Sequence, residues 1–74
     1  MTYKLSAIIE QDQHGYYAYC PELKGCQTQG DSIEEAIDNL REAAALYLET
    51  MAPDEIQAVV SRTILATSLE VAGA

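Results

Sequence analysis

The strongest local signal in this sequence is a helix start at Ser32. The Ser32 hydroxyl can accept a hydrogen bond from the Glu35 amide while the Glu35 carboxylate reaches back to the Ser32 amide, which is the capping box that opens a helix. Apolar residues then recur at helical spacing: Ile33, Ala36, Ile37, Leu40, Ala43, Ala44, Tyr47 and Leu48. The pattern predicts one long helix that ends near Thr50, ahead of Pro53.

The length of the chain sets what this helix can pack against. The 74 residues make one small domain, residues 1–74, whose own core supplies no more than roughly 3–5 kcal/mol, so self-association or a partner is expected. Hydrophobic residues make up 49%, which excludes a disordered chain, and no apolar run approaches the ~20 residues of a membrane span. Residues 1–10 alternate and end in an acid, so we expect no secretory signal and a soluble, cytoplasmic protein.

Three short segments before the helix are predicted to be strands. Residues 3–10 alternate between apolar and polar, residues 16–20 are rich in aromatic side chains, and the turn at 11–15 between them predicts antiparallel pairing. Pro21 ends the second strand, and Gly25 permits the reversal into a third strand over residues 26–29.

Two further elements are predicted after the long helix. Pro53 opens a short helix through Val60, and residues 63–71 alternate as a fourth strand. The expected fold is therefore α+β with the order β-β-β-α-β: a three-stranded antiparallel meander, the long helix on one sheet face, and a fourth strand parallel to the first.

The charge of the chain restricts its partners. Twelve acidic residues against four basic ones give a net charge of -8, and Lys4, Lys24, Arg41 and Arg62 are scattered singly. A nucleic-acid surface needs clustered Lys and Arg to neutralise phosphates, so no direct nucleic-acid binding is expected. A basic protein partner is favoured instead.

The residues that could carry chemistry are too few and too dispersed for a catalytic, cofactor or metal site. Cys20, Cys26 and His14 do not supply the four ligands of a structural zinc site, and the strands offer only Glu10 and Glu70 to a two-metal centre. We expect no enzyme activity, and His14 is expected to be a solvated turn residue. Both cysteines are expected to be reduced, although the five residues between them could form a hairpin loop that places them within disulfide reach in an oxidising environment.

Residues 15–36, GYYAYCPELKGCQTQGDSIEEA, followed by Asn39 and Glu42-Ala43, resemble the HicB-like antitoxin family of bacterial toxin–antitoxin systems. The resemblance implies a partial ribonuclease H-like fold without nuclease activity. It also implies binding and neutralisation of a small HicA-type toxin, a ribonuclease with a double-stranded-RNA-binding-like fold. Many family members add a C-terminal operator-binding segment, which we do not expect here because three residues follow Val71.

Several side chains are candidates for contacts with other proteins. Glu34, Asp38 and Glu42 stand four residues apart, so like charges stack along one stripe of the helix. This stripe either confers solubility or mimics the phosphates that a basic ribonuclease expects. Residues 21–25 are interpreted first as a structural reversal, although Glu22 and an exposed Leu23 could also anchor a partner there. Tyr16, Tyr17 and Tyr19 are candidates for an oligomer interface.

The sequence thus predicts a non-enzymatic antitoxin that forms a homodimer or higher oligomer. The alternative is a self-associating interaction or adaptor domain of the same fold that has no toxin partner.

Overall fold

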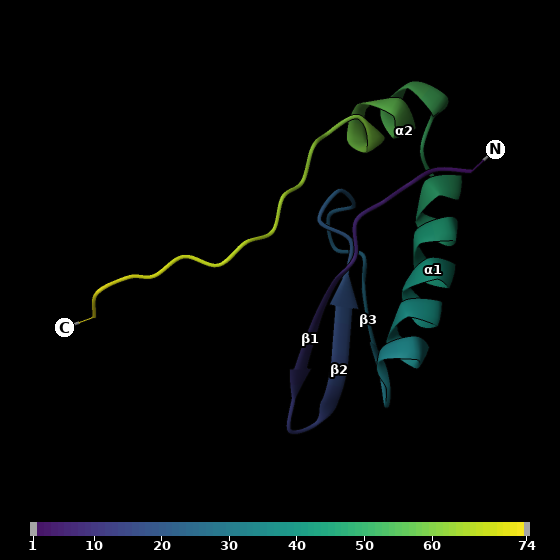
Figure 1. Ribbon diagram of the computed structural model, residues 1–74. Helices are drawn as coiled ribbons and strands as arrows, with labels where there is room; N and C mark the ends of the chain where they lie inside the picture. Colours follow the sequence, from purple (N-terminus) through teal and green to yellow (C-terminus); the bar gives the residue numbers. More distant parts are fainter. Residues whose placement is uncertain (1, 74) are drawn as a thin grey trace.

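The computed structural model describes residues 2–73 and contains three strands followed by two helices (Figure 1). The strands form one antiparallel sheet in the order β1-β2-β3. The elements are β1 (Ile8–Asp12), β2 (Gly15–Tyr19), β3 (Gln27–Gly30), α1 (Ile33–Glu49) and α2 (Pro53–Val60). The predicted α+β class, antiparallel meander, long helix and short second helix are confirmed.

The β1–β2 hairpin closes on the two residues Gln13 and His14, between the paired residues Asp12 and Gly15. The Asp12 side chain accepts a hydrogen bond from the His14 amide at 2.8 Å, and Gly15 adopts a φ of +131°, which glycine tolerates. At its other end the pairing stops at Ile8 and Tyr19. The prediction that the first strand starts at residue 3 is therefore wrong, because Pro21 ends β2 and leaves residues 3–7 without a strand partner.

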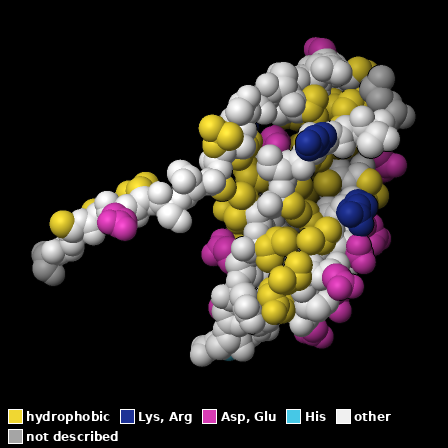
Figure 2. Space-filling model, in the orientation of Figure 1, with side chains coloured by type: hydrophobic (Ala, Val, Ile, Leu, Met, Phe, Trp, Pro, Cys, Tyr) yellow, Lys and Arg dark blue, Asp and Glu magenta, His cyan; other side chains and the backbone are white. Residues whose placement is uncertain are grey.

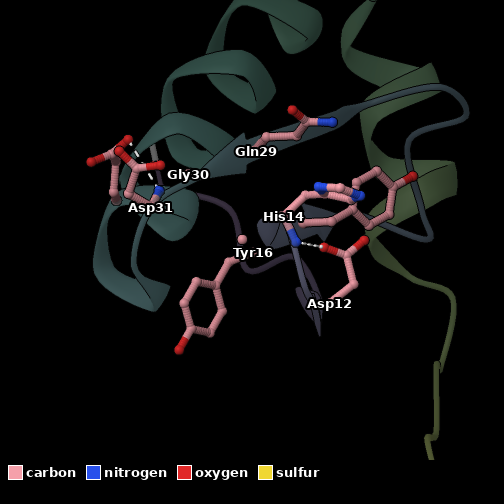
Figure 3. A pocket seen from close by; sticks show the side chains of 9 residues that line it. Asp12, His14, Tyr16, Gln29, Gly30 and Asp31 are labelled. Atoms are coloured by element: carbon pink, nitrogen blue, oxygen red, sulfur yellow. Dashed lines mark hydrogen bonds between the residues drawn. The ribbon is translucent and has the colours of Figure 1, made fainter.

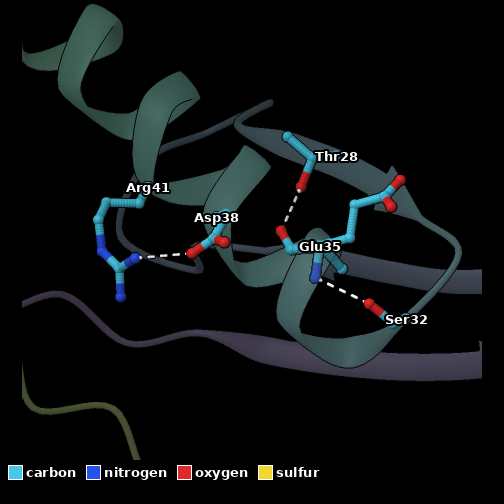
Figure 4. A network of polar contacts seen from close by, with 6 residues as sticks. Thr28, Ser32, Glu35, Asp38 and Arg41 are labelled. Atoms are coloured by element: carbon cyan, nitrogen blue, oxygen red, sulfur yellow. Dashed lines mark hydrogen bonds and ion pairs between the residues drawn. The ribbon is translucent and has the colours of Figure 1, made fainter.

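The start of α1 follows the predicted cap with one difference (Figure 4). The Ser32 hydroxyl accepts a hydrogen bond from the Glu35 amide at 3.0 Å, as predicted. The Glu35 carboxylate accepts a hydrogen bond from the Asp31 amide at 3.3 Å, one residue before the predicted donor. The helix ends at Glu49 and is capped by Thr50, whose amide donates to the Tyr47 carbonyl at 3.1 Å.

The long helix packs on β3 and β2. The Thr28 hydroxyl donates to the Ala36 carbonyl at 3.1 Å, and the Asn39 amide donates to the Gln29 carbonyl at 2.8 Å. Gly30 lies so close to α1 that a Cβ atom there would stand 2.6 Å from the Ala36 nitrogen. The core between helix and sheet consists of Ala18, Cys20, Leu23, Cys26, Ala36, Leu40 and Ala44, with Leu5, Ile9, Tyr16 and others packed around it.

Residues 63–73, which we call the tail, contain no strand, so the predicted fourth strand is absent from residues 2–73. The tail runs away from the sheet as an extended segment (Figure 1). Leu65, Leu69 and Val71 are 86%, 77% and 77% exposed. Alternation makes a segment suitable for a strand, but a strand forms only where a neighbouring backbone accepts its hydrogen bonds, and this tail has no such neighbour.

The projecting tail makes the molecule elongated. Its radius of gyration is 14.2 Å, against about 11 Å for a compact domain of this length. Neither helix within the described residues has the length and apolar character needed to cross a lipid bilayer.

Candidate partner-binding surface

The outward side of α1 carries a line of carboxylates. Ala36, Leu40 and Ala44 are buried on the inner side of the helix. Glu34, Asp38 and Glu42 each lie two residues away from one of these positions, which is about 200° around the helix, and all three are exposed. We call these three residues the acidic stripe. Acidic side chains follow the edge of the body occupied by α1 (Figure 2).

Little of this negative charge is neutralised within the chain. Arg41 pairs with Asp38 at 2.9 Å (Figure 4), and an exposed pair of this kind contributes about 0–1 kcal/mol to stability. Among residues 2–73, neither Glu34 nor Glu42 has a cationic partner within salt-bridge distance. The acidic stripe is therefore a preformed anionic surface on a rigid helix.

The tyrosines of β2 divide between the two sheet faces. Tyr17 and Tyr19 lie on the face opposite α1 with ring centroids 5.7 Å apart and an interplanar angle of 43°, and the Tyr17 hydroxyl bonds to Gln27. Tyr16 points to the helix side and packs against the core. The predicted alternation is confirmed, while an interface at these residues remains a prediction.

The two candidates in the β2–β3 loop are not on the surface. Leu23 is 1% exposed and belongs to the core, and Glu22 is 6% exposed. The interpretation of Leu23 as an exposed partner anchor is wrong because the loop folds inward, and the loop is the structural reversal that was its other interpretation. Two tight turns hold it there, in which the Leu23 amide donates to Cys20 and the Cys26 amide donates to Leu23.

Glu22 instead replaces a missing strand partner. Its Oε2 atom accepts a hydrogen bond from the Ser6 amide at 2.9 Å. Ser6 precedes Ile8 by two residues, so its amide points to the same side as that of Ile8, toward β2, at the level where Pro21 has ended the ladder. Burial raises the pKa of Glu22, but the hydrogen bonds from Ser6 and the charge of Arg62 outweigh it and hold this pKa below its ordinary value.

The Glu22 contact makes stability depend on pH. Because the folded-state pKa lies below the ordinary value of 4.5, the contribution is complete above that pH and is lost as the pH falls through the folded-state pKa. We expect Glu22→Gln to lower the free energy of unfolding by about 1 kcal/mol at pH 7, with a smaller difference from wild type toward pH 3. Urea unfolding from pH 7 to pH 3 measures this difference in the free energy of unfolding. Glu10→Gln, which changes an exposed glutamate, is the control. A difference that stays constant with pH would contradict the assignment.

The two cysteines are buried free thiols. The Cys20 amide donates to the Cys26 carbonyl at 3.1 Å across the base of the loop. Burial raises the pKa of Cys20 to about 11, with further contributions from Cys26 and Glu22, and burial also raises the pKa of Cys26. Neither thiol is therefore activated as a nucleophile.

A shallow hollow of about 280 Å³ lies at the hairpin end of the sheet (Figure 3). Its lining includes the side chains of Asp12, His14, Tyr16 and Glu35. The two carboxylates already accept hydrogen bonds within the chain, Asp12 from the His14 amide and Glu35 from the Asp31 amide. His14 is exposed, as predicted. Within the described part of the chain, no group of three or more His, Cys, Asp or Glu side chains is arranged to hold a metal ion.

A larger groove, of about 390 Å³, separates residues 2–7 from α1. Its apolar lining includes Tyr3, Leu5, Ile37, Leu40 and Leu48. Apolar side chains are visible between the sheet and the helix in Figure 2. Nothing in the sequence predicts this opening, because each of these residues has the spacing of an ordinary core position.

The chain is similar to one protein-family model and to several known bacterial proteins. Residues 5–72 match a family model described as HicB_like antitoxin of bacterial toxin-antitoxin system. A UPF0150 protein of Helicobacter pylori is 41% identical over 68 residues, which cover 92% of this chain and 94% of that protein. A UPF0150 protein of Synechocystis sp. is 48% identical over 50 residues, 66% of this chain and 63% of that protein. No solved structure matches the chain.

Proposed function

Because the chain belongs to the HicB-like antitoxin family of bacterial toxin–antitoxin systems, we propose that it binds and neutralises a small, basic HicA-type ribonuclease toxin. The proposed action is occlusion: the antitoxin covers the basic surface with which the toxin holds RNA. The chain itself performs no chemistry in this proposal. Because such a toxin cleaves cellular RNA, the proposed place of action is the cytoplasm.

The observation that carries this proposal is the acidic stripe on α1. A surface that binds RNA is lined by Lys and Arg, and a row of fixed carboxylates offers these side chains the charge that phosphates would supply. Glu34 and Glu42 have no cationic partner within the described chain, so a toxin need not displace an internal contact to bind them. A helix that served stability alone would mix charges of both signs along this stripe.

The partial ribonuclease H-like fold expected for the family is also part of this proposal. A partial ribonuclease H-like sheet needs a fourth strand beside β1, and no strand pairs with that edge in the part of the chain that the structure describes. We infer that the arrangement is completed only on assembly.

Co-expression tests the proposed function. We expect a basic protein encoded beside this chain to arrest growth and cleave RNA when produced alone, and an equimolar amount of this chain to restore growth and suppress cleavage. Purified wild-type chain should bind that protein and show no cleavage of its own. Failure to bind or to rescue would contradict the proposal, and RNA cleavage by the purified chain would contradict its non-enzymatic part.

The alternative function, a self-associating adaptor without a toxin, gives a different result in the same experiment. Under that alternative, pull-down from native cells recovers no small basic protein, and the chain has no effect on growth arrest.

A further inference from the structure

We propose that the tail of one copy of this protein completes the sheet of a second copy, in a reciprocal exchange that forms a two-fold symmetric dimer. In this dimer, residues 63–71 lie as a fourth strand along the edge formed by residues 3–7 and β1, which we call the free edge. This inference does not depend on the toxin.

The first observation is that two segments with strand-like alternation both lack a strand partner. Residues 3–7 continue β1 but have no β2 residues opposite them, and residues 63–71 pair with nothing in the described chain. The Ser6 amide donates a hydrogen bond to the Glu22 carboxylate on the side of the strand that faces β2. This contact leaves the outer side of the free edge without a strand among residues 2–73. A strand placed on the outer side would bond to the backbone groups that β1, as an edge strand, leaves open.

The second observation is that the side chains of the tail match the groove beside this edge. Leu65, Leu69 and Val71 share one face of an extended tail, whose other face carries Ser68 and Glu70. The groove between residues 2–7 and α1 is lined by Leu5, Ile37, Leu48 and other apolar residues. A strand along the free edge would direct its apolar face into this groove, removing exposed leucines from water. Nine residues of strand span about 30 Å, which covers nearly all of the ten-residue free edge.

The third observation is the direction of the tail, which selects a second copy over the tail's own sheet. At the end of α2 the Ser61 amide donates to Gln57 and the Arg62 amide donates to Val59, so the exit direction is held by hydrogen bonds. Ile64 is still half-buried, but every residue from 65 to 73 is exposed. The tail diverges from β1 and ends far from the body (Figure 1), which gives the molecule a long axis of 46 Å. A short, fixed connection followed by an unpaired strand is the arrangement that favours exchange between copies.

Sedimentation of the full chain over a concentration series tests the proposal. We expect wild type to be a dimer, and Leu65→Lys with Leu69→Lys to raise the dimer dissociation constant at least about 100-fold, since each dimer buries four such leucines. The matched control is Ala66→Lys with Ser68→Lys, which adds the same charge to the opposite face of the tail and should leave the dimer intact. Circular dichroism confirms that each variant is folded.

A mixing experiment identifies where the tail binds. Ile37→Lys places a charge in the groove and should also give monomers, while its tail is intact. Mixing this variant with the Leu65→Lys, Leu69→Lys variant should restore dimers. In the mixed dimer, the unaltered tail of the Ile37→Lys chain can bind the unaltered groove of the other chain. A monomeric wild type, a dimeric Ile37→Lys variant, loss of the dimer in the control pair, or no dimer on mixing would each overturn the proposal. Fold-back of the tail onto its own sheet gives a monomeric wild type, and so does a tail that binds only a toxin. Tail-to-tail pairing leaves the Ile37→Lys variant dimeric.

Discussion

Reversal of charge at Glu34 and Asp38 to lysine is expected to slow association with the toxin about 10- to 100-fold at low salt, with little change in the stability of the antitoxin. Both side chains are exposed on α1, so their replacement disturbs no packed contact, although the change at Asp38 removes its ion pair with Arg41. Electrostatic steering acts before contact, so the loss should appear in the association rate and disappear near 1 M salt, where the screening length is about 3 Å. Stopped-flow or surface-plasmon kinetics across a salt series measures it.

A matched control separates the acidic stripe from the total charge. Glu10→Lys with Asp54→Lys also changes two exposed acids, and each reversal adds two charges, so both double variants move the net charge from -8 to -4. Glu10 lies on β1 and Asp54 in α2, away from the stripe. We expect the control to retain most of the wild-type association rate. An equal loss of association rate in both variants, or no loss in the stripe variant, would contradict the proposal that α1 faces the toxin.

Gly30→Ala is expected to remove much of the stability of the fold. The new Cβ atom would meet backbone at 2.6 Å from the Ala36 nitrogen and 3.0 Å from its Cα, so β3 and α1 must separate. That separation strains the Thr28 and Asn39 hydrogen bonds that join the two elements. Overpacking of this kind costs about 1–3 kcal/mol. For a domain of this size the change should lower Tm by roughly 5–20 °C.

Gly73→Ala is the matched control for this stability measurement. It makes the same chemical change at a site where a Cβ atom meets no other atom within 4 Å, so Tm should stay near wild type. Both variants must be compared at one protein concentration, since assembly would couple stability to concentration. A Gly30→Ala protein as stable as wild type would show that β3 and α1 can move apart without cost.

Local signals predicted most of the secondary structure correctly because their causes are local. Ser32 and Pro53 mark helix starts through their own backbone geometry and capping, and the helix that follows each of them lies where the apolar spacing placed it. Pro21 and Gly25 marked the reversal between β2 and β3 for the same reason. The alternation of Tyr16 and Tyr17 likewise predicted which sheet face each would occupy.

Predictions that depended on distant partners failed or shifted. The interpretation of Leu23 as a partner anchor required an exposed side chain, but the two turns at Cys20 and Cys26 bury it. The role of Glu22 depends on Ser6, sixteen residues away in sequence, and no local pattern reveals that contact. The groove beside α1 exists only because α1 packs on β3 and β2 and leaves space beside residues 2–7.

By itself, the amino-acid sequence determined the helices, the hairpin and the excess of negative charge, all of which follow from neighbouring residues or from simple counts. Only the tertiary structure decided which alternating segments become strands. Residues 8–12 have β2 beside them and pair, whereas residues 3–7 and 63–71 alternate as well but have no strand paired with them among residues 2–73. The physical reason is that a helix satisfies its hydrogen bonds within one segment, while a strand requires a second segment to satisfy its own.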